Sequence, residues 1–190
     1  MIEFAGYQEA LLRLKSVYLD LQKQFPSLQR FDFGGCLGIF YDRQDLALEK
    51  ELLGQYAEIT LKTLSDLQCT LQSEPGRWLM GHCGVLISQV QYIKKTSHKT
   101  FVIIDSGMNH LIRPSLYEAH HEIAPLKKAS GAMICDVVGP ICESSDFFAK
   151  DRSLTTVADG DFVAIMDSGA YGYSMASVYN LQELPLEICI

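Results

Sequence analysis

A change of pattern near residue 79 constrains the fold more than any other feature of this sequence. Before that point, apolar residues recur at helical spacing over 5–24 and 45–67, and each helical stretch is followed by a short β-rich run, at 30–33 and at 69–72. Long helices that alternate with short strands predict parallel strand pairing through right-handed crossovers. The first 79 residues are therefore expected to form an α/β region.

After residue 79 the sequence is mostly β-rich, with closely spaced turns and one short helix expected near residues 115–121. The expected strands cover residues 84–93, 99–105, 131–138, 161–167 and 185–190. This pattern is typical of a sandwich or a barrel. We expect a β-domain over residues 80–190. Since a complete (β/α)8 barrel needs about 250 residues, residues 1–79 could form the end of such a barrel but not a whole one.

Charge and composition narrow the class of function. The formal net charge of −7 argues against nucleic acid as a main partner, because phosphate binding needs clusters of basic residues. No apolar run reaches the roughly 18–20 residues of a membrane span, and the N-terminus lacks a signal-peptide layout, so we expect a cytoplasmic protein. The six cysteines show no CxxC pair, which favours reduced thiols. We expect no metal site, since adjacent residues such as His120 and His121 rarely share a metal.

Two motifs in the first region follow expected strands. Gly34-Gly35-Cys36-Leu37-Gly38 would let backbone N–H groups approach a phosphate, although a structural turn explains it equally well. Glu74-Pro75-Gly76-Arg77 places a carboxylate and a planar guanidinium at another strand end. Taken alone, this second motif also fits a surface turn with an incidental ion pair.

Three motifs in the second region carry reactive or charged side chains. Arg113 and Tyr117 lie four residues apart at a Pro-Ser helix start, so both could face a carboxylate-bearing substrate. Cys142 and Glu143 follow a Gly-Pro turn and could supply a proton donor and an amine-binding carboxylate. Tyr171 lies in a glycine-bounded turn after an expected strand. The alternatives are a surface arginine beside a core tyrosine, a buried structural cysteine and an aromatic plug.

The order of these motifs resembles the C-terminal half of the diaminopimelate decarboxylases. The resemblance extends over nearly the whole chain and is carried by FDFGGCLGI, SEPGR, IRPSLYEAHHEI, VVGPICESSDFFAKDR and DSGAYGYSMASVYN. The last two segments distinguish this family from ornithine and arginine decarboxylases. The resemblance implies an alanine-racemase-like (β/α)8 barrel that binds pyridoxal 5'-phosphate (PLP), followed by a β-domain. It also implies a homodimer with sites shared across the interface, and decarboxylation of meso-2,6-diaminopimelate to L-lysine.

The resemblance also implies a role for each matched residue. By this resemblance, the cofactor phosphate would be contacted by the backbone of Gly34, Gly35, Gly38 and Gly76. Glu74 would pair with the pyridine nitrogen, and Tyr171 would complete the cofactor site. Substrate binding falls to Arg77, Arg113, Tyr117 and Glu143, while Cys142 is the candidate proton donor. Cys142 and Glu143 would serve the site of the partner subunit.

The sequence departs from the family at two points. No lysine lies in the context of the family's cofactor-bearing lysine, so we expect this portion alone to be inactive. Cys36 stands where a third glycine is usual. Three hypotheses follow: the C-terminal portion of a decarboxylase, a non-catalytic dimer partner of a full-length relative, or a degenerate product that folds through its β-domain. The first is favoured by the joint retention of Cys142, Glu143, Arg77, Arg113 and Tyr171.

Overall fold

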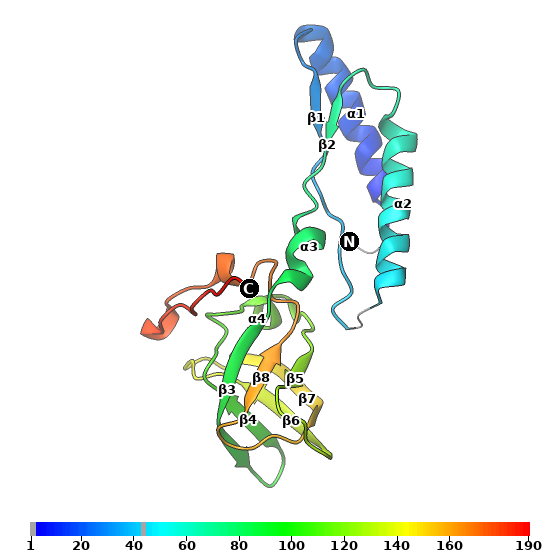
Figure 1. Cartoon of the computed structure of the whole chain (residues 1–190). Coiled ribbons are helices and arrows are strands. Elements are labelled where there is room, and N and C mark those ends of the chain that lie inside the picture. The colour runs from blue at the N-terminus through cyan, green and yellow to red at the C-terminus, as the bar shows by residue number, and fades with distance from the viewer. Residues whose placement is uncertain (1–2, 43–44) are drawn as a thin grey trace. The chain divides into compact units, whose positions relative to one another are not determined.

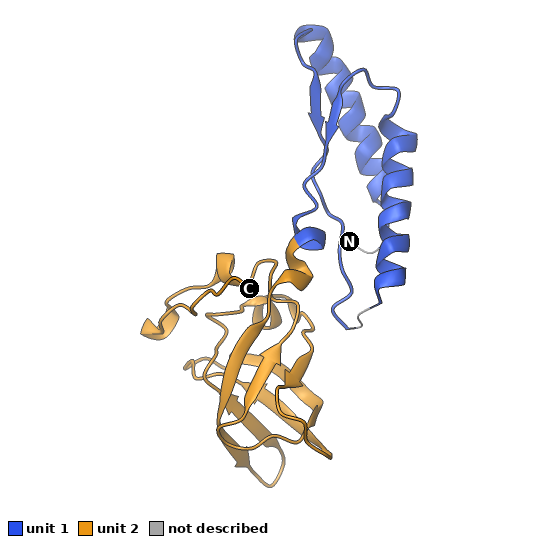
Figure 2. Ribbon diagram, in the orientation of Figure 1, with its two compact units in different colours: residues 1–79 blue, residues 80–190 orange. Residues whose placement is uncertain are grey.

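The structure is a computed structural model that describes residues 3–42 and 45–190. The chain divides into two compact units, residues 1–79 and 80–190 (Figure 2). Each unit has its own hydrophobic cluster. Across the described residues, no helix combines the length and the apolarity needed to cross a bilayer.

Unit 1, residues 1–79, packs two long helices beside a pair of short strands (Figure 1). Its elements are α1 (Tyr7–Gln24), β1 (Arg30–Asp32), α2 (Leu46–Leu64), β2 (Thr70–Gln72) and the start of α3 (Gly76–Met80). Asp45 caps α2, since its carboxylate accepts hydrogen bonds from the backbone N–H groups of Ala47 and Leu48. β1 and β2 pair in parallel, which confirms the predicted pairing.

The core of unit 1 is built from aromatic and aliphatic side chains on the facing sides of α1 and α2. The rings of Tyr7 and Tyr56 stack with their centroids 4.9 Å apart, and Phe31 of β1 joins the same cluster. The Tyr7 hydroxyl lies 2.8 Å from the Thr60 hydroxyl, which satisfies both groups inside the core. Burial raises the pKa of Tyr7.

Unit 2, residues 80–190, is a mixed six-stranded sheet with the strand order β5-β8-β3-β4-β6-β7. Its only parallel pair among the described strands is β4 with β6. The two outer strands β5 and β7 also contact each other, so the sheet curls until it is nearly closed. The strands are β3 (Leu86–Lys95), β4 (Thr100–Ile104), β5 (Ile123–Pro125), β6 (Ala132–Val138), β7 (Phe147–Thr155) and β8 (Phe162–Ile165), with short helices η1 (Gly81–Cys83), α4 (Arg113–Tyr117), η2 (Tyr173–Met175) and η3 (Tyr179–Leu181).

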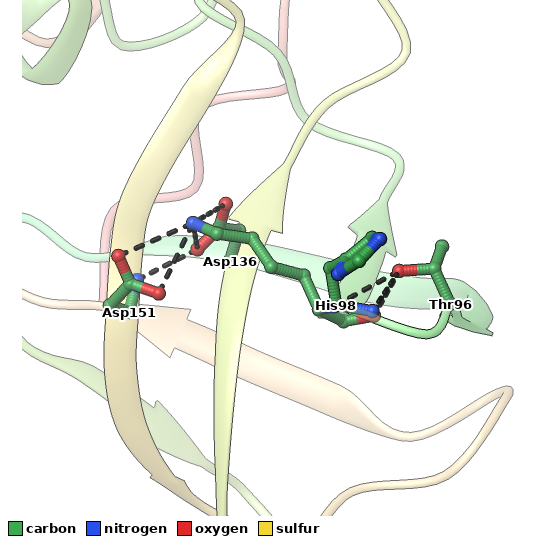
Figure 3. Close-up of polar contacts among 5 residues, drawn as sticks. Thr96, His98, Asp136 and Asp151 are labelled. Carbon is green, nitrogen blue, oxygen red and sulfur yellow. Dashed lines mark hydrogen bonds and ion pairs between the residues drawn. The ribbon is translucent and has the colours of Figure 1, made fainter.

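A polar cluster marks an irregularity between β6 and β7. The backbone N–H of Asp151, a residue with φ of +47°, donates to an Asp136 carboxylate oxygen at 2.7 Å. The Lys99 ammonium lies 2.9 Å from the same carboxylate and 3.1 Å from that of Asp151 (Figure 3). These carboxylates raise the pKa of Lys99, so the lysine remains charged between them.

For this half of the chain the sequence predicted a sandwich or a barrel. The strands form one nearly closed sheet, which is the barrel-like alternative, and not the two packed sheets of a sandwich. β5 and β7 were not predicted, and the short helix covers 113–117 instead of 115–121. The predicted strand at 185–190 is wrong, because this segment has no strand partner and Leu186 and Ile188 are 84% and 74% exposed.

Candidate functional site

The glycine loop after β1 and the loop after β2 are held together in unit 1. Both begin at the carboxyl ends of parallel strands, which meet at the same edge of the sheet. The backbone N–H of Glu74 donates to the Gly34 carbonyl at 2.9 Å, and the Ser73 hydroxyl donates to it at 3.0 Å. A Cβ atom at Gly35 would overlap the Glu74 carbonyl oxygen, so a glycine is required at position 35.

Tyr56 fixes this pair of loops from the helix side. Its hydroxyl lies 2.9 Å from the Gly35 carbonyl and 3.0 Å from the Ser73 hydroxyl, while its ring belongs to the core of unit 1. Asp32 contributes on the other side, because its carboxylate accepts a hydrogen bond from the Gly34 N–H at 2.9 Å. The sequence predicted Tyr56 only as a member of an apolar helix face, so its second role was missed.

Residues 34 and 36 both adopt left-handed backbone conformations. Gly34 has φ of +75° with open space where a side chain would lie, and Cys36 has φ of +69°. The second value is uncommon for a residue with a side chain. It explains why a glycine would suit position 36. Gly38 is buried two residues further along.

Glu74 and Arg77 lie on the loop after β2 and at the start of α3. The Glu74 side chain is exposed. The backbone carbonyl of Glu74 accepts a hydrogen bond from the Gly76 N–H at 2.8 Å. The Arg77 guanidinium donates to the Tyr41 hydroxyl at 2.7 Å and lies 5.9 Å from the centre of the Tyr41 ring. Gly34, Gly35, Glu74, Gly76 and Arg77 are thus grouped in one loop pair of unit 1.

In unit 2, a buried carboxylate organises the turn that carries Cys142 and Glu143. Asp146 accepts hydrogen bonds from the backbone N–H groups of Met108 and Ile141, each at 2.6 Å. Burial raises the pKa of Asp146, and these two hydrogen bonds oppose the rise. The side chains of Cys142 and Glu143, on the turn that Asp146 holds, are exposed. Asp146 was not singled out from the sequence, although it lies within the motif VVGPICESSDFFAKDR.

Two contacts bring other segments of unit 2 to this turn. The Ser115 hydroxyl on α4 donates to the carbonyl of Ser145. The Cys142 N–H donates to the Asn180 side-chain oxygen at 3.1 Å, in the segment that follows Tyr171. Tyr171 itself has φ of +62° and is 44% exposed. Three of the predicted motifs of unit 2 are therefore adjacent in the fold.

Arg113 and Tyr117 have opposite environments despite their shared helix. Arg113 is buried, and its Nη1 lies 2.7 Å from His121 Nε2. Tyr117 is 59% exposed. Arg113 is thus the buried member of the pair and Tyr117 the exposed one, the reverse of the surface arginine and core tyrosine that the alternative expected.

The backbone before Tyr171 is hydrogen-bonded to the N-terminal segment of unit 2. The Ser168 N–H donates to the Gly84 carbonyl at 2.8 Å, and the Gly169 N–H donates to the Gly81 carbonyl at 3.2 Å. Asp167 pairs with His82, with 2.6 Å between Oδ1 and Nδ1. The other carboxylate oxygen of Asp167 is buried and has no hydrogen-bond partner in the described part of the chain. The His82–Asp167 pair joins positions 85 residues apart, which the sequence analysis missed.

The chain is similar to known proteins over its whole length. The family model of the pyridoxal-dependent decarboxylase C-terminal sheet domain matches residues 17–169. Diaminopimelate decarboxylase of Aquifex aeolicus is 38% identical over 192 residues, which cover all of this chain and 45% of that protein. The Helicobacter pylori enzyme is 46% identical over 165 residues, which cover 86% of this chain and 40% of that protein.

Solved structures agree with these sequence matches. The crystal structure of the H. pylori diaminopimelate decarboxylase complexed with L-lysine is 41% identical, has a TM-score of 0.83, and is matched over 97% of this chain and 45% of that one. The M. jannaschii enzyme in co-complex with L-lysine has a TM-score of 0.84 at 34% identity. The chain spans less than half the length of the relatives it matches. It belongs to the pyridoxal-dependent decarboxylases, with its matches in the C-terminal portion of diaminopimelate decarboxylases, as the motifs indicated.

Proposed function

We propose that this chain is the C-terminal portion of a diaminopimelate decarboxylase that converts meso-2,6-diaminopimelate to L-lysine. The observation that carries the proposal is the joining of the glycine loop to the Glu74 loop, in a chain whose whole length is similar to such enzymes. Unit 1 would be the last strand-helix units of the (β/α)8 barrel, and unit 2 the β-domain. The assembled enzyme would be a cytoplasmic homodimer.

The residues of the loop pair fit PLP. The close approach at Gly35 and the left-handed backbone at Gly34 form a cradle in which backbone groups of Gly34, Gly35, Gly38 and Gly76 would line a phosphate. The N–H groups of Gly34 and Gly76, which donate to Asp32 and Glu74 in this structure, would exchange those hydrogen bonds for the phosphate. The exposed Glu74 carboxylate would pair with the protonated pyridine nitrogen. PLP, when bound, supplies an electron sink for the electrons left by departing carbon dioxide. Tyr171 would complete the cofactor site through its hydroxyl.

The remaining residues would orient the substrate and deliver a proton. Arg77, Arg113 and Tyr117 would bind the substrate carboxylates, since a guanidinium matches a carboxylate with two parallel hydrogen bonds. Cys142 and Glu143 would act in the site of the partner subunit. There Glu143 would hold the distal amine, and Cys142 Sγ would donate the proton that replaces the lost carboxylate. Their exposure in this structure supports such a role.

The proposal can be tested by restoring the missing length. The chain would be co-expressed with the N-terminal part of the H. pylori enzyme, loaded with PLP, and assayed for release of carbon dioxide from meso-diaminopimelate. We expect activity from the pair and none from either part alone. Cys142→Ala should lower kcat by about 100-fold or more, as loss of a general acid does, whereas Cys189→Ala, at another exposed cysteine, should leave it unchanged.

Other outcomes of the same assay separate the alternatives. Release of carbon dioxide from ornithine or arginine, but not from diaminopimelate, would identify a related basic amino-acid decarboxylase. A pair that assembles and binds PLP but releases nothing from any of the three substrates would favour the non-catalytic dimer partner and contradict the proposal.

A further inference from the structure

The contact between Arg113 and His121 has a defined direction. Arg113 Nη1 lies 2.7 Å from His121 Nε2, and both side chains are buried. An arginine has only hydrogen-bond donors, so the imidazole nitrogen in this contact has to be the acceptor. His121 Nε2 therefore carries a lone pair and no hydrogen.

The other imidazole nitrogen of His121 is fixed by the backbone. Its Nδ1 lies 2.8 Å from the Met166 carbonyl oxygen, which can only accept. Nδ1 thus carries the hydrogen, and the two contacts together specify the neutral Nδ1–H tautomer. Burial lowers the pKa of His121 to about 4, and the Arg113 charge adds to the effect.

We propose that His121 is the positioning residue of Arg113, holding the guanidinium at a set place relative to the backbone that leads to Tyr171. The inference rests on the proposed function, in which Arg113 binds a substrate carboxylate. Met166, which fixes the imidazole, immediately precedes Asp167 and the turn of Tyr171. One imidazole thereby links the substrate-binding helix α4 to the cofactor-binding turn.

The charged groups around His121 come from several elements. Asp167 after β8 favours the protonated imidazole, and His120 disfavours it. Arg152 on β7 donates to the His121 carbonyl at 3.0 Å and also contacts His120, and it lies 3.7 Å from Glu122. Of these groups, Arg152 holds the His121 backbone through its carbonyl. At low pH, protonation of Nε2 would replace its lone pair by a donor and displace Arg113.

Two substitutions distinguish the contact of His121 with Arg113 from its contact with the Met166 carbonyl. His121→Gln places an amide oxygen near the position of Nε2 and keeps an acceptor for Arg113. His121→Asn places its amide near Nδ1, which keeps the Met166 contact and removes the acceptor. His98→Gln on the exposed turn between β3 and β4 is the matched control (Figure 3). All variants would be made in the full 190-residue chain.

The first readout is the imidazole and guanidinium 15N spectrum of the labelled chain. We expect His121 to show a protonated Nδ1 and a bare Nε2 at pH 5.5, where an unperturbed histidine is mostly cationic. The Arg113 resonance should be sharp in the parent chain and in His121→Gln, and lost in His121→Asn. A bare Nδ1, a cationic His121 at pH 5.5, or an Arg113 resonance unchanged in His121→Asn would overturn the inference.

The second readout is binding of L-lysine to the PLP-loaded co-expressed pair described above. His121→Asn should weaken binding about tenfold, and His121→Gln should restore most of it, because the acceptor for a charged donor is regained. Equal losses in both variants would contradict the positioning role. Failure of the parent pair to bind lysine, with the expected spectra intact, would instead count against the proposed function.

Discussion

The two units of this chain bury their apolar residues to different degrees. In unit 2 the curled sheet encloses a core in which Val90, Val102, Ile104, Val163 and Ile165 are completely buried. In unit 1 the two-stranded sheet leaves several leucines and valines of α1 and α2 more than half exposed, namely Leu12, Val17, Leu46 and Leu61. A two-stranded sheet has marginal stability on its own, whereas a nearly closed one pairs most of its strands.

This difference concerns the candidate site directly. The loops proposed to bind the cofactor phosphate belong to unit 1, whose core is less complete, while α4 and the Cys142 turn belong to unit 2, whose sheet is nearly closed. We therefore expect unit 2 to unfold at a higher temperature than unit 1. Trp78, the only tryptophan of the chain, packs against the core of unit 1, so its fluorescence reports on that unit.

The largest expected effect comes from the core of unit 2. Ile165→Ala removes a completely buried side chain of β8 and should lower the free energy of unfolding of this unit by about 2–5 kcal/mol. The measurement is thermal unfolding followed by far-UV circular dichroism. The Trp78 fluorescence transition should stay where it is.

The control for this substitution lies on the same sheet. Ile134→Ala removes a side chain of β6 that is 62% exposed, and it should change stability by less than about 0.5 kcal/mol. If Ile165→Ala shifts both transitions together, the units unfold as one cooperative body and the comparison between them fails.

Acidification should weaken unit 2 through His121. The folded-state pKa of about 4 lies below the ordinary value of 6.5, so folding favours the neutral imidazole. Its contribution is present above pH 6.5 and is lost as pH falls towards 4, up to about 3 kcal/mol. Unfolding of unit 2 measured in urea between pH 7 and 4 should show this loss.

The variant His121→Gln isolates the contribution of this residue, because it has no titrating imidazole. Asp146 acts in the opposite direction, since its raised pKa makes the folded state bind a proton more readily as pH falls. The difference between parent and variant cancels that term. Parallel curves for the two proteins would show that His121 titrates as it does in the unfolded chain.

Local patterns predicted the elements of unit 1 well. Helices α1 and α2 and the parallel pair β1–β2 follow from apolar spacing and from proline and glycine positions, which act within a few residues. The strand predicted at 185–190 failed because alternating apolar residues indicate only a face, and pairing needs a partner strand that the pattern cannot locate. β5 was missed because it is only three residues long and, unlike β1 and β2, contains a proline, which argues against a strand.

The candidate site shows the same limit. The motifs identified Gly35, Glu74, Arg113 and Cys142, whose chemistry is visible in the sequence. The groups that hold them in place were not found, because Tyr56, Asp146 and His121 act through contacts with distant positions. His121 contacts the carbonyl of a residue 45 positions away, and no spacing rule connects the two.

The smallest expected effects concern the glycine loop of unit 1. Gly35→Ala should destabilise this unit by about 1–3 kcal/mol, because the new methyl group must push the loop away from the Glu74 carbonyl. The measurement is Trp78 fluorescence during urea unfolding. Phosphate protection of the loop against proteolysis should fall in parallel.

Neighbouring positions separate crowding from backbone strain. Gly34→Ala meets open space but sits at φ of +75°, so only the left-handed conformation is penalised, at about 1 kcal/mol. Cys36→Gly should remove such a penalty and stabilise unit 1 by up to about 1 kcal/mol, because a glycine adopts φ of +69° without strain. If Gly35→Ala proves no more harmful than Gly34→Ala, the two loops are not in contact in solution. The joining of the glycine loop to the Glu74 loop, on which the proposed cofactor site depends, would then have to be abandoned.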